Sequence, residues 1–274
     1  MSGAEEADFS TLTRVISERA GLVLDAYKDK CLKRRIAVRM RACGAHTYAD
    51  YRRVLDSSPA ECERLGDALT INVTRFYRNP ETWNRFAAHL LPELLERREG
   101  RLRIWSAGCA SGEEPYTIAM LVAEACAVRG MPEWIGRARI DATDIDRVSL
   151  ERAAAARYRA ECFADTPAAL VDRYTLAIAG GEREVVSSLR DCVHIQRLDF
   201  SGGRPPEPEY DLICCRNVVI YFERTMQERL FLTFADLLAP DGILILGKVE
   251  TLFGPARDRL VLVDARERIY RRPA

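Results

Sequence analysis

Residues 103–121 read Arg-Ile-Trp-Ser-Ala-Gly-Cys-Ala-Ser-Gly-Glu-Glu-Pro-Tyr-Thr-Ile-Ala-Met-Leu, and this stretch decides the fold. The Ile-Trp opening is typical of a buried strand, and the small residues at 107–112 are typical of a tight turn. From Ile118 onward, apolar residues recur at helical spacing. A strand, a turn and an amphipathic helix in this order form half of a βαβ unit.

The helix of this unit is predicted to begin close to Gly112. Ser111 is a good N-cap residue, and Glu114 falls three residues later, as in a capping box. Pro115 lies in the first turn, where a missing N–H costs little. Helix N-termini bind anions, so the charge of the neighbouring side chains decides which ligand the turn can accept.

The turn carries acids where a dinucleotide site would need bare backbone amides. Only Gly108 and Gly112 are glycine, so the G-x-G-x-x-G pattern is absent, and Glu113 and Glu114 follow directly. These acids would repel a pyrophosphate but suit a cofactor that carries an adenosine, an ammonium and no phosphate. We therefore predict S-adenosylmethionine as the cofactor. The alternative is that both glutamates only cap a Rossmann-like helix.

An acid at the end of the next predicted strand supports this cofactor. Residues 138–146 alternate between apolar and polar positions and end in Asp144 and Asp146. In doubly wound folds, such an acid holds the ribose hydroxyls. We assign that role to Asp144, whereas Asp146 is expected to cap the helix at 148–157.

Length and composition describe one enzyme-sized chain. It has 274 residues, 48% hydrophobic content and zero formal net charge, so it can bury a large core and implies no global electrostatic partner. The nine cysteines show no C-x-x-C spacing, and the three histidines form no metal or triad pattern. Without a signal peptide or a long apolar run, we expect a cytoplasmic protein with neither disulfides nor a bound metal.

The chain divides into a helical domain at 1–78 and an α/β domain at 79–274, because strands are predicted only after a helix at 80–98. A predicted helix at 27–43 has a strongly basic polar face, made of Lys28, Lys30, Lys33, Arg34, Arg35, Arg39 and Arg41. This face is either merely solvated or docks onto an acidic partner or nucleic acid.

Later segments complete the predicted sheet. Strands are expected at 193–198, 211–215, 243–247, 260–263 and 268–271, with helices at 148–157 and 224–238. The last two strands form a hairpin, which places an antiparallel strand at the edge of an otherwise parallel sheet. A Gly180-Gly181 turn predicts a small antiparallel β insertion at about 174–192. The predicted fold class is α/β: a Rossmann-like domain with a helical N-terminal domain and an inserted β subdomain.

Two groups of polar side chains stand where ligand sites are expected. The first lies at the junction of the predicted domains and consists of Asn72, Thr74 and Arg78. The second follows the apolar strand at 211–215 and consists of Arg216, Asn217 and Tyr221. Open α/β sheets bind ligands at this carboxyl edge. The plainer alternative is that Asn217 only bonds loop backbone and Tyr221 only packs.

Five ordered stretches resemble the chemotaxis receptor methyltransferases, the CheR-type protein-glutamate O-methyltransferases. They read L-T-I-N-V-T-R-F-Y-R-N-P at 69–80, S-A-G-C-A-S-G-E-E-P-Y at 106–116, A-T-D-I-D at 142–146, C-R-N-V-V-I-Y-F at 215–222 and L-A-P-D-G-I-L-I-L-G at 238–247. The family has a helical N-terminal domain, a Rossmann-like S-adenosylmethionine-dependent methyltransferase domain and an inserted antiparallel β subdomain, which agrees with the organisation predicted above.

The resemblance also implies roles for individual residues. The implied cofactor contacts are Asn72, Thr74, Arg78, Glu113, Glu114, Asp144, Asp199, Phe200, Arg216 and Asn217. Between the two glutamates, Glu114 is the preferred contact for the methionine end, and Asp199 and Phe200 would flank the adenine. Arg216 and Asn217 would line the methyl-transfer pocket. The catalytic candidates are Arg78, which would orient the substrate carboxylate, and Tyr221, whose hydroxyl would hold the reacting centre.

The implied reaction transfers a methyl group from S-adenosylmethionine to glutamates of a methyl-accepting chemotaxis receptor and leaves S-adenosylhomocysteine. It requires neither a general base nor a metal, because the attacking glutamate is already ionised near neutral pH. The basic helix, through Lys30, Lys33, Arg34 and Arg39, would dock onto the acidic helices of the receptor's cytoplasmic domain. The β insertion would bind a receptor tail, although its turn at 179–182 is short.

Two other classes of function remain open from the sequence. The first is a nucleic-acid methyltransferase, although the chain has Arg-Asn-Val-Val-Ile-Tyr where base-amine methyltransferases usually carry an Asp/Asn-Pro-Pro-Tyr/Phe turn. The second is a regulatory protein that binds the cofactor without turnover. We expect no nucleic-acid partner and no membrane insertion. The receptor, its glutamates and the oligomeric state stay open.

Overall fold

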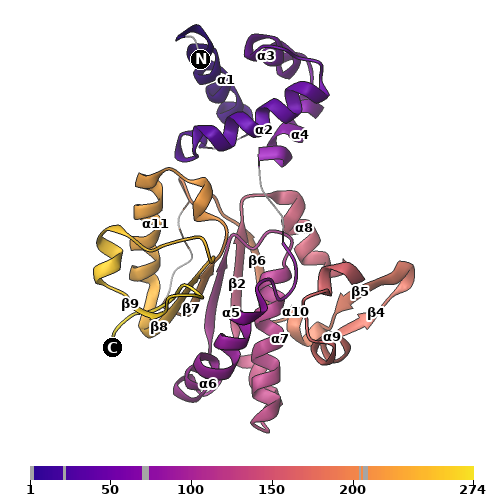
Figure 1. The fold of residues 1–274 in the computed structure, drawn as a ribbon. Coiled ribbons are helices and arrows are strands. Elements are labelled where there is room, and N and C mark those ends of the chain that lie inside the picture. Colours follow the sequence, from indigo (N-terminus) through magenta and orange to yellow (C-terminus); the bar gives the residue numbers. More distant parts are fainter. Residues whose placement is uncertain (1–2, 21–22, 70–73, 204, 206–208) are drawn as a thin grey trace. The chain divides into compact units, whose positions relative to one another are not determined.

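The chain forms two compact units in a computed structural model that describes residues 3–20, 23–69, 74–203, 205 and 209–274 (Figure 1). The first unit comprises Met1–Ile71, Asp199–Gly203 and Tyr221–Gln227. The second comprises Asn72–Leu198, Arg204–Ile220 and Glu228–Ala274.

The first unit is built from helices, as predicted. They are α1 (Gly3–Ala20), the short η1 (Leu24–Ala26), α2 (Asp29–Ala42), α3 (Tyr48–Ser57) and α4 (Pro59–Leu69). Local signals set their starts: Thr47 and Asp50 form a capping box before α3. Pro59 is the first residue of α4, and the Ser58 hydroxyl accepts from the Glu61 N–H at 3.3 Å. Buried apolar side chains from all four long helices form the core of the unit.

A seven-stranded sheet forms the centre of the second unit, in the order β6-β2-β1-β7-β8-β10-β9. Its strands are β1 (Arg103–Ala107), β2 (Arg139–Asp144), β6 (Val193–Arg197), β7 (Tyr210–Cys215), β8 (Leu238–Leu246), β9 (Val261–Asp264) and β10 (Ile269–Arg271). The first five are parallel, and β10 runs antiparallel to both β8 and β9. The predicted Rossmann-like fold class with an antiparallel hairpin at one edge is confirmed.

Helices cover both faces of this sheet. The helices after residue 79 are α5 (Pro80–Arg85), the π-helical η2 (Phe86–Leu90), α6 (Leu91–Arg98), α7 (Glu113–Val128), α8 (Arg147–Ala155), α9 (Ala168–Tyr174), α10 (Ser187–Arg190) and α11 (Arg224–Leu237). Ile104 of β1 belongs to the same buried cluster as Ile118 and Leu121 of α7. Its neighbour Trp105 contacts Phe234 of α11 with ring centroids 5.5 Å apart. Because successive strand residues face opposite sides, α7 and α11 cover opposite faces.

The inserted β subdomain is larger than predicted. It is a three-stranded antiparallel sheet in the order β3-β5-β4, with β3 at Arg157–Arg159, β4 at Thr175–Ala177 and β5 at Glu182–Val185. The predicted bounds of about 174–192 omit β3, because three residues are too short to show an alternating pattern. The predicted glycine turn does join β4 to β5, and both glycines have positive φ angles.

The second unit begins earlier than the predicted boundary at residue 78. Phe76 and Tyr77 are buried in its core. The Phe76 ring stacks on Phe163 with centroids 4.2 Å apart, and its N–H donates to the Cys162 carbonyl at 3.1 Å. The Tyr77 N–H donates to the Thr117 hydroxyl in α7 at 3.0 Å. The loop before α5 is therefore part of the α/β unit.

Candidate functional site

The turn after β1 is fixed between the ends of two neighbouring strands. The N–H groups of Gly108 and Cys109 both donate to the Thr143 carbonyl of β2, at 2.8 and 2.9 Å. Gly108 has a φ of 85°, and a Cβ there would lie 2.3 Å from a methyl carbon of Val218, in the loop after β7. Glycine is therefore needed at position 108 for both its backbone conformation and this close approach.

Helix α7 begins one residue later than the capping pattern predicts. Its N-cap residue is Gly112, with a φ of 98° and no side-chain cap. A Cβ at Gly112 would lie 2.6 Å from the Tyr158 hydroxyl and 2.9 Å from the Ala153 Cβ, so only glycine permits this close packing. The prediction of a capping box formed by Ser111 and Glu114 is therefore wrong, because tertiary packing sets the start of the helix.

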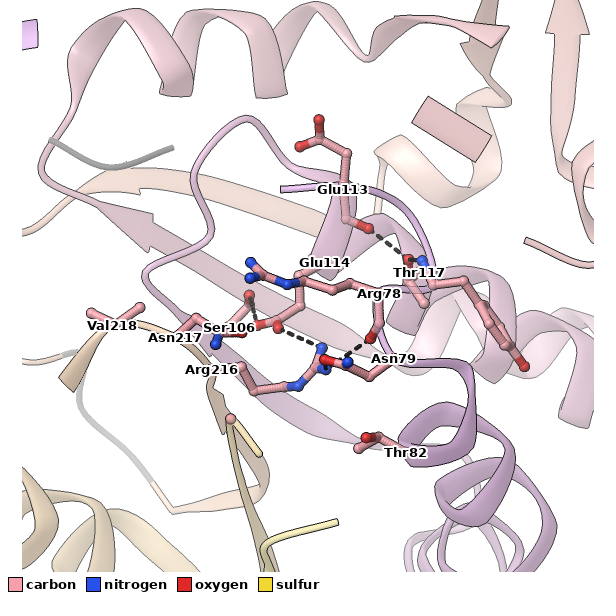
Figure 2. A network of polar contacts seen from close by, with 12 residues as sticks. Arg78, Asn79, Thr82, Ser106, Glu113, Glu114, Thr117, Arg216, Asn217 and Val218 are labelled. Atoms are coloured by element: carbon pink, nitrogen blue, oxygen red, sulfur yellow. Dashed lines mark hydrogen bonds and ion pairs between the residues drawn. The ribbon is translucent and has the colours of Figure 1, made fainter. Parts of the chain in front are cut away.

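The two glutamates at the start of α7 point in different directions (Figure 2). Glu114 accepts a hydrogen bond from the Ser106 hydroxyl at 2.9 Å and lies 3.3 Å from the guanidinium of Arg216. Glu113 accepts from the Ser111 hydroxyl at 2.8 Å. Burial raises the pKa of both carboxyls, because it removes water from the ionised forms. Two buried acids beside one turn favour a cationic ligand.

The guanidinium of Arg216 bonds to other residues of the chain. One amino group faces Glu114, and the other donates to the Arg78 carbonyl at 2.8 Å and to Asn79 Oδ1 at 2.9 Å. The guanidinium carbon also lies 4.8 Å from the centre of the Trp83 ring. The side chain is 2% exposed. The guanidinium therefore holds the turn and the loop at residues 78–79 together, and the predicted role of Arg216 in lining the transfer pocket stays a prediction.

Asp144 lies at the end of β2, as predicted, and is bound to backbone on two sides. Its carboxylate accepts from the Ala110 N–H at 2.8 Å and from the Asp146 N–H at 3.0 Å. Burial raises its pKa. Asp146 caps α8 through the N–H groups of Val148 and Ser149, which confirms that prediction. The backbone bonds hold the Asp144 carboxylate beside the glycine turn.

Asn217 follows β7 in left-handed backbone, with a φ of 61°. Its side-chain Oδ1 is buried, and within the described residues it has no hydrogen-bond partner. A buried amide oxygen without a donor is costly, so a ligand donor at this position would satisfy it. The Asn217 N–H donates to the carboxylate of Glu250 at 3.0 Å. Sequence reasoning assigned no role to Glu250, because its signal is a single acid in a loop.

Three further residues predicted for the site precede α5 in the sequence. Thr74 is half-buried in this loop, and Asn72 lies outside the described residues. Arg78 is half-buried, and its side chain lies beside Glu114 in Figure 2. Its positive charge lowers the tendency of Glu114 to take up a proton, which partly opposes the effect of burial on the pKa of that carboxyl. Of the two predicted catalytic residues, Arg78 therefore lies at this site, and its catalytic role stays a prediction.

Asp199, Phe200 and Tyr221 group with the helical unit. Asp199 accepts from the Ser201 N–H at 2.8 Å, and the Phe200 ring lies 6.5 Å from that of Phe222. The Tyr221 carbonyl accepts from the Lys28 N–H at 2.9 Å. The predicted contacts of Asp199 and Phe200 with the cofactor, and of Tyr221 with the reacting centre, stay predictions.

The basic residues of α2 divide into two sets. Arg39 forms an ion pair with Glu61 at 2.6 Å, and Glu61 also accepts from the Tyr51 hydroxyl at 2.8 Å. Lys33 lies 3.1 Å from Glu6 and 4.5 Å from the centre of the Phe9 ring. Lys33 and Arg39 therefore form contacts inside the helical unit, and their predicted role in docking stays a prediction.

The exposed set of α2 residues forms one stripe. Lys30, Arg34 and Arg41 are exposed, and Val38 between them is 50% exposed. Spacings of four and three residues place these four side chains on a single helix face. We call this set the basic stripe. It retains two of the four predicted docking residues, Lys30 and Arg34.

The donor set at the carboxyl edge fits S-adenosylmethionine. Glu113 and Asp144 are buried acids beside the turn, Glu114 is a third acid with 12% of its side chain exposed, and Asn217 contributes a buried acceptor. Such a site suits an ammonium, a sulfonium and ribose hydroxyls, and it disfavours phosphate. Among the described residues, no group of three or more histidine, cysteine or acidic side chains is placed to hold a metal ion. No helix in the described ranges is long and apolar enough to cross a membrane.

The fold and the site define the class of the protein as a Rossmann-like, S-adenosylmethionine-dependent methyltransferase. A family model described as "CheR methyltransferase, SAM binding domain" matches residues 72–269, and one described as "CheR methyltransferase, all-alpha domain" matches residues 7–70. The chain therefore belongs to the CheR methyltransferase family, which confirms the resemblance seen in the five sequence stretches.

Curated relatives agree with this assignment. The "Chemotaxis protein methyltransferase" of Klebsiella aerogenes is 35% identical over 92% of this chain and 86% of its own length. That of Salmonella typhimurium is 34% identical over the same shares of the two chains. That of Listeria monocytogenes is 31% identical over 92% of each chain. A solved structure of PKMT2 from Rickettsia typhi with AdoHcy covers 63% of this chain and 26% of its own, at 13% identity and a TM-score of 0.36.

Proposed function

We propose that this methyltransferase modifies the side-chain carboxylates of glutamates in the cytoplasmic domain of methyl-accepting chemotaxis receptors. The products are glutamate methyl esters and S-adenosylhomocysteine, and the role is adjustment of receptor signalling. Membership of a chemotaxis methyltransferase family supports this substrate class. The observation that carries the proposal is the position of Arg78 beside the acids of the site.

Arg78 places a positive charge beside the acids of the site. Glu113 and Asp144 are buried and Glu114 is largely so, and these acids suit a cationic cofactor but would repel a substrate carboxylate. A carboxylate can enter such a site only if a cation accompanies it. Arg78 supplies this cation, and its planar guanidinium matches the geometry of a carboxylate. Arg216 holds the Arg78 carbonyl, so the backbone from which this side chain extends is fixed.

The chemistry needs alignment more than proton transfer. The bound cofactor supplies an electrophilic methyl group on a sulfonium. A glutamate oxygen of the receptor forms a bond to that methyl carbon while the carbon–sulfur bond breaks, and its electron pair stays on sulfur. No proton moves, because a glutamate with an ordinary pKa is ionised near neutral pH. The residues of the chain therefore contribute by orienting and partly desolvating the carboxylate.

We further propose that the basic stripe of α2 docks onto the receptor. Methyl-accepting helices present glutamates, so their surface is acidic. Lys30, Arg34 and Arg41 offer complementary charge, and Val38 adds an apolar contact in the middle. Lys33 and Arg39 lie outside the exposed set and pair with acids of the helical unit.

The test is transfer of radiolabelled methyl from S-adenosylmethionine to purified receptor cytoplasmic fragments. The expected result is base-labile label that disappears when glutamine replaces the candidate glutamates. Arg78→Ala should lose most of this transfer. Arg75→Ala is the matched control, because Arg75 lies in the same loop but is 55% exposed and pairs with Asp165.

Three outcomes would contradict the proposal. Label that resists base would exclude a carboxyl ester. Tight cofactor binding without transfer to any fragment would indicate another substrate or a regulatory role. An Arg78→Ala enzyme as active as Arg75→Ala would remove Arg78 from the mechanism.

A further inference from the structure

A single buried carboxylate ties together the loops that follow β7 and β8. Glu250 is 3% exposed. One of its oxygens accepts from the N–H groups of Gly247 and Asn217, at 2.6 and 3.0 Å. The other accepts from the N–H groups of Val218 and Ile220, at 2.9 and 3.4 Å. The carboxylate thus replaces water for four backbone donors at the carboxyl edge of the sheet.

The loop that Glu250 holds carries residues of the cofactor site. Asn217 is its first residue and presents the buried amide oxygen. Val218 packs on Gly108 of the turn after β1, so closely that a Cβ on that glycine would overlap it. Because Glu250 binds the backbone of Asn217 and Val218 directly, it sets where both side chains stand.

The energetics show why this position needs a carboxylate. Burial opposes ionisation and raises the Glu250 pKa, whereas the backbone N–H groups favour the ionised form. A glutamine of similar size has only one oxygen, and its NH2 group would face N–H donors. Two backbone donors would then lose their acceptor in a buried place, which is costly.

We infer that Glu250 is a positioning residue for cofactor binding, acting through the backbone of Asn217 and Val218. This inference rests on the proposed use of the site as the cofactor site. It predicts that loss of the carboxylate weakens binding of the cofactor and of its product by at least about tenfold, as two weakened hydrogen bonds to a charged group imply. The KM for the receptor fragment should change little.

The experiment compares Glu250→Gln with Asp211→Asn. Asp211 is a matched control, because it is also buried and accepts from the Arg103 N–H at 2.9 Å and from Arg98 at 2.6 Å. It lies at the amino end of β7, away from the carboxyl edge. Affinity for S-adenosylhomocysteine is measured by calorimetry on folded protein. Amide hydrogen exchange is followed at residues 217–220.

The expected result is a selective effect of Glu250→Gln. Its affinity for S-adenosylhomocysteine should fall at least about tenfold, and protection should be lost at 217–220, whereas Asp211→Asn should keep wild-type affinity even if both variants lose similar stability. Equal affinities in the two variants would overturn the inference.

A second variant keeps the test decisive if Glu250→Gln does not fold. A Cβ at Gly247 would lie 2.7 Å from the Glu250 carboxylate and 2.8 Å from the Asn217 nitrogen, so Gly247→Ala should displace the same contacts. Wild-type affinity in folded Gly247→Ala would also overturn the inference.

Binding of S-adenosylhomocysteine needs no methyl acceptor. Failure to methylate receptors would therefore count against the proposed function alone, and a wild-type protein that does not bind this product would refute both.

Discussion

Arg216 and Glu114 form a buried ion pair, with 3.3 Å between Nη1 and Oε2 and with side chains 2% and 12% exposed. Arg216 follows β7 and Glu114 lies in the first turn of α7, so the pair joins segments 102 residues apart. The second amino group of the same guanidinium holds the Arg78 carbonyl. Arg216 therefore couples the turn of the proposed cofactor site to the loop that carries the proposed substrate cation.

Replacing Arg216 with lysine should keep the charge but lose the coupling. A single ammonium cannot hold Glu114, the Arg78 carbonyl and Asn79 in the fork geometry of a guanidinium. We expect Arg216→Lys to fold and to bind S-adenosylhomocysteine about tenfold more weakly, as loss of one hydrogen bond to a charged group predicts. Arg216→Ala should lower the free energy of unfolding by about 3 kcal/mol, because Glu114 is left buried and unpaired.

Urea unfolding and calorimetry would measure these two effects. Arg229→Lys is a suitable control for the general effect of the exchange, because Arg229 is an exposed residue of α11. A lysine variant at 216 with wild-type affinity would show that the guanidinium fork does not set the site.

Cofactor binding should weaken on acidification at a higher pH than ordinary carboxyl groups would cause. Burial raises the pKa of Glu113 and Glu114 above 4.5 and that of Asp144 above 3.8. An acid with a raised pKa carries its charge above that pKa and loses it as the pH falls through it. Attraction for the cationic cofactor is therefore lost as the pH falls. The contribution of these three acids to the stability of the empty protein rises over the same interval, because burial disfavours their ionised forms.

Calorimetric titrations with S-adenosylmethionine between about pH 5 and about pH 8 would test this dependence. Glu114→Gln should bind more weakly at neutral pH and show a flatter profile. Identical profiles for the two proteins would mean that Glu114 does not contribute to the dependence.

Two arginines of α2 should have opposite effects on stability and docking. Burial opposes the ionisation of Glu61, but hydrogen bonds from Arg39 and Tyr51 outweigh the effect of burial and lower the pKa of its carboxyl group. Arg39→Ala should therefore destabilise the protein by about 3 kcal/mol, because a buried acid loses its partner. Arg34→Ala should leave stability unchanged within about 0.5 kcal/mol, because Arg34 is an exposed surface residue, and raise the KM for the receptor fragment.

The pH dependence of stability gives an independent check on the Arg39 pair. An acid with a lowered pKa stabilises the fold above its unfolded value of 4.5, and this contribution is lost as the pH falls through the folded pKa. The difference in stability between wild type and Arg39→Ala should therefore shrink in acid. An Arg39→Ala protein of normal stability with impaired docking would contradict this expectation and support the docking role predicted from the sequence.

The parts of the site that could be predicted are those that depend on where a strand ends. Asp144 and Glu114 stand at the carboxyl edge because the apolar pattern locates β1 and β2, and parallel strands bring their ends together. The partners of a side chain could not be predicted in the same way. Arg216 and Arg39 look like available cations in the sequence, yet buried acids from distant segments neutralise both.

Packing explains the other differences from the sequence-based predictions. Ser111 has the chemistry of an N-cap, but the close contact of Gly112 with Ala153 and Tyr158 moves the start of α7. No role for Glu250 was predicted from the sequence, because its four partners are backbone N–H groups that any residue type except proline could supply. Such contacts become visible only when the loops are folded together.

Gly108 and Gly180 allow backbone strain to be separated from steric contact. Their φ angles are 85° and 82°, so alanine at either position should cost about 1 kcal/mol for the left-handed backbone. A Cβ at Gly180 meets nothing within 4 Å, whereas one at Gly108 would overlap Val218 at 2.3 Å. Gly108→Ala should therefore cost about 2 to 4 kcal/mol in total, since overpacking adds its own penalty.

Urea unfolding of the two alanine variants gives the steric cost as the difference between them, and affinity for S-adenosylhomocysteine shows whether the contact matters to the site. Gly108→Ala should weaken that affinity, and Gly180→Ala should not. Combining Gly108→Ala with Val218→Ala should recover part of the lost stability, because the overlapping methyl group is removed. If Gly108→Ala is no less stable than Gly180→Ala and binds normally, the loop after β7 can yield, and the close approach of Val218 is not what shapes the cofactor turn.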